Sequence, residues 1–381
     1  MTELLLVRNV LILLLVVTHL CAEAQAKVPC EVAREALATA SSIRMLSAVK
    51  EVPCIVQSKS EMKDFISATI KEEASSDRMN FEERIFKKVK LIPKDYNYTQ
   101  GLSEIYLSQI AGYYDVKAKH YVMADWLPKM LQPAISVHEL THALQDQHFN
   151  LDKFTDQKTG STDSILARAA LVEGDATAVM VDYTAMLAGG QKLATLKSTE
   201  KFLLQNLFFG GLSMGAIKAP ESLKFILTFP YSSGFRFAHA LMGRNGYQSL
   251  TEAFKFPPQS TEQILHPRSK YPFEAPTIVE PFTEHLPEGS KEIFRDSLGE
   301  FVTSLVVTAF NQDRGKAANA AAGWGGDTIV LYERSLPDKG DTVVWNTVWD
   351  TKNDAQEFCD VFKSVDMSVF CRDSSVRITF D

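Results

Sequence analysis

The sequence predicts an α+β fold, with helices in the centre of the chain and strands toward its end. Residues 133–187 carry apolar side chains at helical spacing, whereas Asp327–Glu333 and Thr342–Trp349 are rich in the β-branched and aromatic residues of strands. Of the 381 residues, 45% are hydrophobic and 23% are charged, which is a globular composition. A chain of this length can bury one large core or two modest ones.

The N-terminus has the layout of a secretory signal rather than of a folded element. Arg8 precedes the apolar run Val10–Val17, which is followed by alternating alanines up to Ala26. Such a run is too short for a membrane-spanning helix, which needs about 18 apolar residues or more. We therefore expect residues 1–26 to be cleaved as a signal peptide, leaving an exported chain without a stable membrane span.

The charge balance excludes nucleic acid as a partner. The chain has 40 Lys and Arg against 47 Asp and Glu, a formal net charge of −7, and it contains no basic block. Binding to nucleic acid through its phosphates requires clustered positive charge. A soluble enzyme or a binding protein is the class that fits.

Four cysteines remain after the expected cleavage, namely Cys30, Cys54, Cys359 and Cys371. They allow three pairings, of which proximity in the sequence favours Cys30–Cys54 and Cys359–Cys371. An oxidising compartment would let both bonds form, and four buried free thiols are the alternative. The sequence has no CxxC motif, so a zinc site built from cysteines is not expected.

The remaining elements follow in order along the chain. Cys30–Lys90 contains apolar residues at helical spacing, which predicts a helix-rich region. Gly112–Met123 alternates apolar and polar residues around a polar turn, which predicts a β-hairpin. The polar loop Asp152–Thr162 divides the central helical stretch in two, and Pro220–Tyr271 contains further helix with several prolines. Near the end we expect a helix over Lys352–Phe362, capped by Asp350 or Thr351, and a last strand pair that ends at Phe380.

The strongest functional signal is His138-Glu-Leu-Thr-His142. Pro133 suits the first turn of a helix that contains this motif. Two histidines four residues apart lie one turn apart on the same helix face, so both imidazoles can reach one metal ion. Glu139 projects beside them and can contact a metal-bound water rather than the metal. The alternative is a surface helix with solvated His and Glu side chains.

A catalytic zinc ion normally has three protein ligands, and Glu173 is the first candidate for the third. Its neighbours at helical spacing are almost all apolar, and a buried carboxylate on such a stripe is costly without a cation. Gly174 costs about 1 kcal/mol relative to Ala in a helix interior, which is tolerable where another helix packs closely. A salt-bridged glutamate without a metal is the alternative.

His148 is the second candidate for the third ligand. His138, His142 and His148 have the spacing of the metzincin zinc motif, but Gln145 stands where that motif has a glycine. The glycine is needed for a backbone turn that other residues disfavour. With Gln145 the helix is expected to continue and carry His148 out of reach, so Glu173 is the favoured ligand.

The HExxH motif, followed 173 − 142 = 31 residues later by Glu173 on a second helix, resembles the gluzincin metallopeptidases. Further blocks resemble a group of largely uncharacterised exported HExxH proteins: His142–His148, Pro230–Gly234, Pro258–Pro267 and Ala321–Asp327. The resemblance implies a zincin-like core that consists of an active-site helix, a second ligand helix and an edge hairpin. The regions expected are a signal peptide at 1–26, a helical N-terminal region at 27–100, this core at 101–290 and a C-terminal α+β region at 291–381.

The resemblance also implies a function, the hydrolysis of a peptide or protein substrate with one Zn²⁺ per chain. His138, His142 and Glu173 would bind the ion, and Glu139 would act as general base on a zinc-activated water. Tyr231 and His266 are the candidates for stabilising the developing oxyanion. The alternatives are a core aromatic residue beside Phe229 for Tyr231 and a structural histidine held by Pro267 for His266. The sequence leaves open a zinc-binding protein without peptidase activity, and a non-enzymatic envelope protein in which the motif is incidental. It does not indicate the oligomeric state.

The chain departs from the gluzincin pattern in one respect. Gluzincins often carry an acidic residue four positions after the ligand glutamate, where it orients the first histidine. Here that position is Thr177, and Asp175 is out of register. Asp146 and Asp175 are therefore the candidates for orienting the histidines.

Overall fold

The computed structural model describes residues 29–381, except for 75–76, 157–158, 200–217, 282–285, 287, 312, 335–339, 364 and 366. The predicted signal peptide at 1–26 lies outside the described residues. Among the helices that are described, none combines the length and the hydropathy that a membrane crossing requires.

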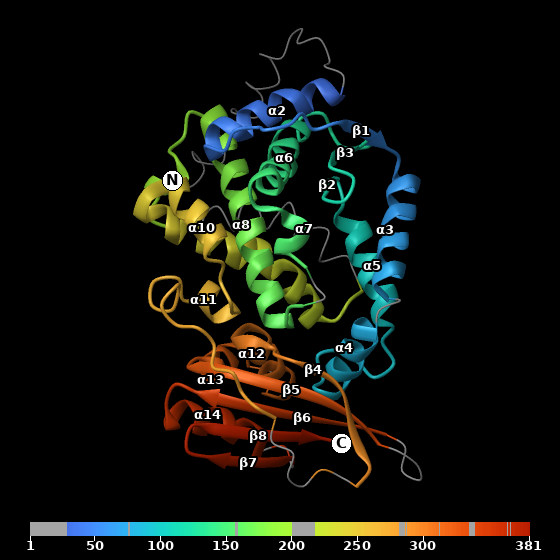
Figure 1. Ribbon diagram of the computed structural model, residues 1–381, viewed down its shortest axis with the longest axis vertical. Coiled ribbons are helices and arrows are strands. Elements are labelled where there is room, and N and C mark those ends of the chain that lie inside the picture. The colour runs from blue at the N-terminus through green and yellow to red at the C-terminus, as the bar shows by residue number, and fades with distance from the viewer. Residues whose placement is uncertain are drawn as a thin grey trace, which may run out of the picture.

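The fold is mixed α+β, as the sequence predicts. Figure 1 shows a helical part, which also carries a small sheet, above a larger sheet formed by the C-terminal part of the chain. The helical part consists of α2 (Pro29–Arg44), β1 (Cys54–Gln57), α3 (Lys59–Ala74), α4 (Asp77–Lys88), α5 (Tyr98–Gln109), β2 (Gly112–Asp115), β3 (His120–Ala124), α6 (Gln132–Phe149), α7 (Leu151–Phe154), α8 (Thr162–Leu187), the 3₁₀ turn η1 (Leu193–Thr195), α10 (Glu221–Lys255) and α11 (Thr261–Leu265). The C-terminal part consists of β4 (Ser290–Asp296), α12 (Gly299–Asn311), α13 (Arg314–Ala321), β5 (Trp324–Arg334), β6 (Gly340–Trp349), α14 (Lys352–Lys363), β7 (Ser368–Arg372) and β8 (Ser375–Phe380).

The central helices α6 and α8 carry the predicted metal ligands, and α10 packs along α8. Ser161 precedes α8, and its side chain accepts a hydrogen bond from the Ser164 backbone N–H as an N-cap does. Asn150 follows the end of α6, and it has the left-handed conformation that asparagine tolerates better than most residues. The sequence therefore predicted both central helices, and local capping explains where α8 starts and α6 ends.

The small sheet has the strand order β1-β3-β2. β2 and β3 form the predicted hairpin, and their antiparallel register pairs Tyr114 with Tyr121. β1, which the sequence did not predict, joins parallel to β3. β2 is consequently an edge strand, and it lies next to α6.

The large sheet is fully antiparallel, with the order β4-β5-β6-β8-β7. The predicted strands correspond to β5, β6 and the β7–β8 pair, and α14 is the predicted helix between them. Of the two predicted capping residues, Thr351 rather than Asp350 caps α14. Its hydroxyl accepts a hydrogen bond from the backbone N–H of Asp354, and the Asp354 carboxylate accepts one from the backbone N–H of Thr351. β4, α12 and α13 were not predicted.

One hydrophobic core runs from the helical part into the sheet. In the sheet it is centred on Trp324 and Trp345, both fully buried, whose indole N–H groups donate to the Asp327 carboxylate. The two parts are also linked by polar contacts: the Asp296 carboxylate at the end of β4 accepts from the backbone and hydroxyl of Thr162 at the start of α8. The sheet thereby holds the N-terminal end of the helix that carries Glu173.

The predicted disulfide pairing is confirmed. Cys30–Cys54 joins α2 to β1, and Cys359–Cys371 joins α14 to β7. Each bond closes a short loop, of 24 and 12 residues respectively, which is why proximity in the sequence identified the partners. Paired cysteines of this kind are typical of proteins from oxidising, extracytoplasmic compartments.

Candidate metal centre

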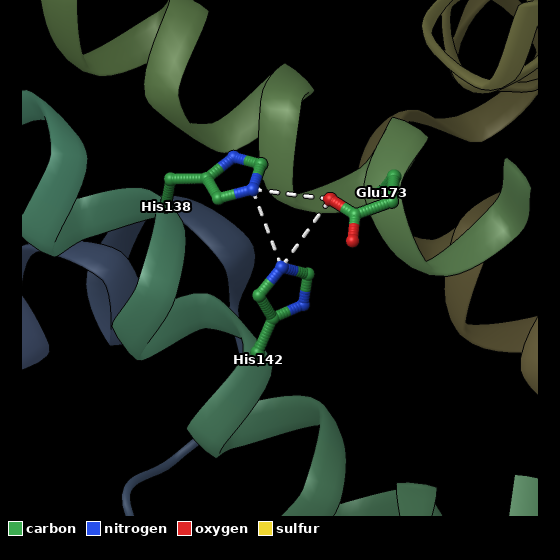
Figure 2. Close-up of side chains that lie close together, drawn as sticks. All are labelled: His138, His142 and Glu173. Carbon is green, nitrogen blue, oxygen red and sulfur yellow. Dashed lines mark hydrogen bonds and ion pairs between the residues drawn. The ribbon is translucent and has the colours of Figure 1, made fainter. Parts of the chain in front are cut away.

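α6 presents the two histidines of the HExxH motif to one point. The His138 and His142 rings are perpendicular, with centroids 4.8 Å apart, and their Nε2 atoms are separated by 3.2 Å. Figure 2 shows both Nε2 atoms turned toward the same carboxylate oxygen, which comes from Glu173 on α8. The helical spacing of the motif thus produces the convergence that it predicts.

Glu173 reaches this point from the second helix. Its Oε2 lies 3.2 Å from Nε2 of His138 and 3.4 Å from Nε2 of His142. The side chains of the two histidines are each 11% exposed and that of Glu173 is 21% exposed, so the group is largely but not fully enclosed. The structure therefore brings together the three side chains that the sequence predicts as ligands.

The three distances fit a single tetrahedral ion. Ligand atoms about 2.1 Å from a tetrahedral Zn²⁺ are about 3.4 Å from one another. The observed separations of 3.2, 3.2 and 3.4 Å are close to that edge length. Two imidazole nitrogens and one carboxylate oxygen are also a donor set suited to a transition-metal ion. His138, His142 and Glu173 could therefore hold one metal ion.

The charges within the group favour a cation at the same point. Burial raises the pKa of Glu173, but His142 and His138 outweigh it and hold that pKa well below its usual range. Burial lowers the pKa of His142, but the Glu173 carboxylate outweighs it and raises that pKa to about 9. A carboxylate that stays ionised among largely buried groups favours a positive charge beside it, which a protonated histidine or a metal ion can supply.

Glu139 lies beside the ligand group without belonging to it. Its Oε2 accepts a hydrogen bond of 3.1 Å from the backbone N–H of Tyr114 on the edge strand β2. Burial raises the pKa of Glu139 above its usual value. The motif glutamate is thus a carboxylate next to the possible ion, and it is fixed by the neighbouring strand.

Tyr231 on α10 lies at the same site. Its ring is nearly parallel to that of His138, at an angle of 24° and with centroids 6.4 Å apart. The Glu173 charge and burial together raise the pKa of Tyr231 well above its usual value. The residue is 46% exposed, so it borders both the ligand group and solvent.

The structure does not bring His266 to this group. His266 follows α11, and its Nε2 lies 2.9 Å from the Glu300 carboxylate of α12. α11 meets α8 at Asp163, whose carboxylate accepts from Thr261. Asp163 precedes Glu173 by ten residues, which is about 15 Å along a helix axis. His266 is therefore held as a partner of Glu300, away from the ligand group.

His148 also lies apart from the ligand group. α6 continues unbroken through Gln145 to Phe149, as the absence of glycine predicts. His148 is exposed, and its Nε2 contacts the Ser47 carbonyl oxygen at 2.8 Å. Within the described chain the ligand group consists of His138, His142 and Glu173.

Gln145 is a residue of the site that the sequence did not predict. Gln145 is fully buried, and its Oε1 lies 2.9 Å from Nδ1 of His142. Of the two acidic candidates for orienting the histidines, Asp175 contacts Gln145, whereas Asp146 binds Lys119 and the Tyr114 hydroxyl. The signal in the sequence was a glutamine three residues after the second histidine, one helical turn further along the same face.

A second acidic group, Glu262, Glu274 and Asp350, surrounds the ammonium of Lys270 at 3.1, 2.8 and 2.7 Å. The lysine supplies the positive charge that these carboxylates need. This group is therefore a salt-bridge network that already contains its cation.

Comparison with known proteins adds one match. A family model described as a domain of unknown function (DUF8575) matches residues 285–375. This span covers β4 to the start of β8, and it contains none of the three ligand candidates. No curated protein matches the chain, and no solved structure matches it.

Proposed function

We propose that this protein is an exported zinc-dependent peptidase with a gluzincin-like site, in which His138, His142 and Glu173 bind one Zn²⁺. The observation that carries the proposal is the spacing of the three ligand atoms, 3.2 to 3.4 Å, around a single point. Two side chains come from a HExxH helix and one from a second helix, as the resemblance implies. The two disulfides suit an exported protein.

The surrounding elements support a zincin-like arrangement of the core. α6 is the motif helix, α8 the second ligand helix, and β2 the strand beside α6. Among the described residues β2 has no strand partner on its outer side. An extended peptide could add to such an edge through its backbone groups.

When bound, Zn²⁺ supplies a Lewis acid that polarises the scissile carbonyl and lowers the pKa of an attacking water toward about 7. Glu139 accepts the proton of that water during attack, and it delivers the proton to the leaving amine. The Tyr114 N–H fixes the Glu139 carboxylate at 3.1 Å, so its orientation is set before the substrate arrives. Tyr231 is the hydroxyl donor available to the developing oxyanion, since it borders both His138 and solvent.

The test combines metal analysis with peptide cleavage. We expect one zinc ion per chain, lost in His138→Ala and retained in His148→Ala, which removes an exposed histidine from the same helix. Glu139→Gln should keep the zinc and lower hydrolysis of a complex peptide mixture by about 10²-fold or more. Hydrolysis that survives Glu139→Gln would contradict the mechanism. Zinc that is lost in His148→Ala would instead favour a metzincin-like site.

A second function is a zinc-binding exported protein without peptidase activity. The enclosure of the site favours it, because the ligand side chains are only 11%, 11% and 21% exposed. Stoichiometric zinc together with no chelator-sensitive cleavage of any peptide in the mixture would support this function over the first.

A further inference from the structure

We propose that Gln145, held in place by Asp175, positions the His142 ring by accepting a hydrogen bond from its Nδ1. The inference deepens the proposed function, on which it rests for the role of His142 as a ligand. Arg44, the last residue of α2, provides the counter-charge that allows Asp175 to be buried. The N-terminal helix thereby supports the metal centre.

The contacts of the Gln145 amide fix which atom faces the histidine. Its Nε2 donates to the Val172 carbonyl oxygen at 3.0 Å and to Asp175 Oδ2 at 2.9 Å. Both partners are acceptors, so the reverse amide orientation would set oxygen against oxygen at both. Oε1 therefore faces His142 Nδ1 at 2.9 Å and can only accept. The proton of the neutral ring lies on Nδ1, which leaves the Nε2 lone pair directed at the ligand group.

Asp175 can hold Gln145 because its own charge is balanced. The Arg44 Nε lies 2.6 Å from Asp175 Oδ1 and 2.8 Å from Oδ2, and both side chains are fully buried. Arg44 is in turn held by α10, where its Nη1 donates to the Thr251 hydroxyl at 3.0 Å and to the Tyr247 carbonyl oxygen at 3.3 Å. Buried ions remain charged only when they are paired in this way. Four helices, α2, α6, α8 and α10, thus meet in one polar network behind His142.

The first histidine has no such support. His138 Nδ1 is buried without a hydrogen-bond partner among the described residues. The hydroxyl of Thr177, four residues after Glu173, is likewise buried and without a partner in the described chain. The described structure therefore orients the second ligand ring and not the first. Partners of this kind are worth about 10- to 100-fold in metal affinity.

Gln145→Met tests the contact at His142, because it keeps the length of the side chain and removes both amide functions. We expect the dissociation constant for Zn²⁺, measured by competition with a chromophoric chelator, to rise about 10- to 100-fold. Thr177→Val is the control, since it exchanges a buried unpartnered hydroxyl close to Glu173, and it should leave the affinity unchanged.

A second readout is the ring proton itself. In metal-free protein labelled with ¹⁵N-histidine, studied above the raised pKa of His142 of about 9 so that the ring is neutral, the ring ¹⁵N shifts should place the proton on Nδ1 in the wild type and in Thr177→Val, and should not place it there in Gln145→Met. A wild type without that proton, or a Gln145→Met variant that binds zinc like the wild type, would overturn the inference. If the wild type binds no zinc, the proposed function fails, while the ring proton still decides the role of Gln145.

Two charge-balanced double variants test Asp175 without leaving an unpaired buried ion. Arg44→Met with Asp175→Asn keeps an oxygen that can accept from the Gln145 amide, and zinc affinity should stay close to that of the wild type. Arg44→Met with Asp175→Leu removes that acceptor, and affinity should fall about as far as in Gln145→Met, 10-fold or more. Equal affinities in the two double variants would show that Asp175 does not position Gln145.

Discussion

Gly174 of α8 and Gly234 of α10 lie in direct backbone contact, because a Cβ atom added to Gly174 would stand 2.1 Å from the Gly234 carbonyl oxygen. The sequence predicts a close helix contact at Gly174, and the partner helix is α10. Glu173 precedes Gly174, and Tyr231 lies one turn before Gly234. The contact therefore sets how far the third ligand candidate is from the tyrosine at the same site.

Gly174→Ala should lower the free energy of unfolding by about 1–3 kcal/mol, because the added methyl group forces α8 and α10 apart. Zinc affinity should fall as well, since Glu173 moves with α8. Urea denaturation and chelator competition measure the two effects. Gly243→Ala is the matched control on α10, since nothing lies within 4 Å of its added Cβ. That exchange should stabilise the helix by up to about 1 kcal/mol, and destabilisation as large as that of Gly174→Ala would contradict the steric explanation.

Tyr231→Phe should lower kcat for peptide hydrolysis by about 10²-fold, the typical effect of losing one oxyanion donor. Zinc affinity should remain close to that of the wild type, because Tyr231 is not among the ligand candidates. His266→Ala should leave kcat unchanged, since His266 pairs with Glu300 away from the ligand group. Steady-state kinetics on a cleaved peptide measures both variants. A larger loss in His266→Ala than in Tyr231→Phe would reverse these roles.

Removal of the metal should lower thermal stability. A ligand that binds only the folded state adds RT ln(1 + [L]/Kd), which is about 2.7 kcal/mol at a free concentration 100 times Kd. We therefore expect the Tm to rise with added Zn²⁺ and to fall with chelator. His138→Ala should respond to neither, because one of the three converging ligand atoms is missing. Equal Tm values with zinc and with chelator in the wild type would contradict binding to the folded chain.

The ion pair between Arg84 on α4 and Asp341 on β6 links the helical part to the large sheet, and its contribution to stability should be lost in acid. Arg84 on α4 binds both oxygens of the Asp341 carboxylate, at 2.8 and 2.5 Å, and this hydrogen bonding lowers the pKa of Asp341. A lowered folded-state pKa means that the pair stabilises the protein above the unfolded pKa of about 3.9, and that the contribution is lost as the pH falls through the folded-state pKa. Asp341→Asn should therefore cost about 1 kcal/mol at neutral pH and nothing once the carboxyl is fully protonated.

Chemical denaturation, from neutral pH down to the pH at which Asp341 is fully protonated, measures the difference in the free energy of unfolding between the wild type and Asp341→Asn. Glu83→Gln is the control, because Glu83 pairs with Lys87 within α4 and does not reach the sheet. Pairs of that kind contribute about 0.3–0.5 kcal/mol. An Asp341→Asn variant whose deficit persists in strong acid would show that the loss is not electrostatic.

Several elements were predictable because their signals are local. The HExxH motif converges on one face through helical periodicity alone, and the C-terminal strands carry dense β-branched and aromatic runs. β4 and α12 were not predicted, because their local sequence does not indicate the structure that each adopts. β4 (Ser290–Asp296) is charged and mostly half-exposed or exposed. α12 (Gly299–Asn311) contains several valines and threonines, which disfavour helix by propensity, and burial against the core overrides that preference.

The sequence by itself determined the α+β class, the two short-range disulfides and the convergence of His138 and His142, since each depends on residues close together in the chain. Only the tertiary structure decided that Glu173 arrives at 3.2 Å from His138, that His266 turns to Glu300, and that Gln145 and Asp175 lie behind His142. These contacts depend on how whole helices pack, through features such as the Gly174–Gly234 crossing. Periodicity identifies which face of a helix is buried, but the partner and its register depend on side chains that are distant in sequence.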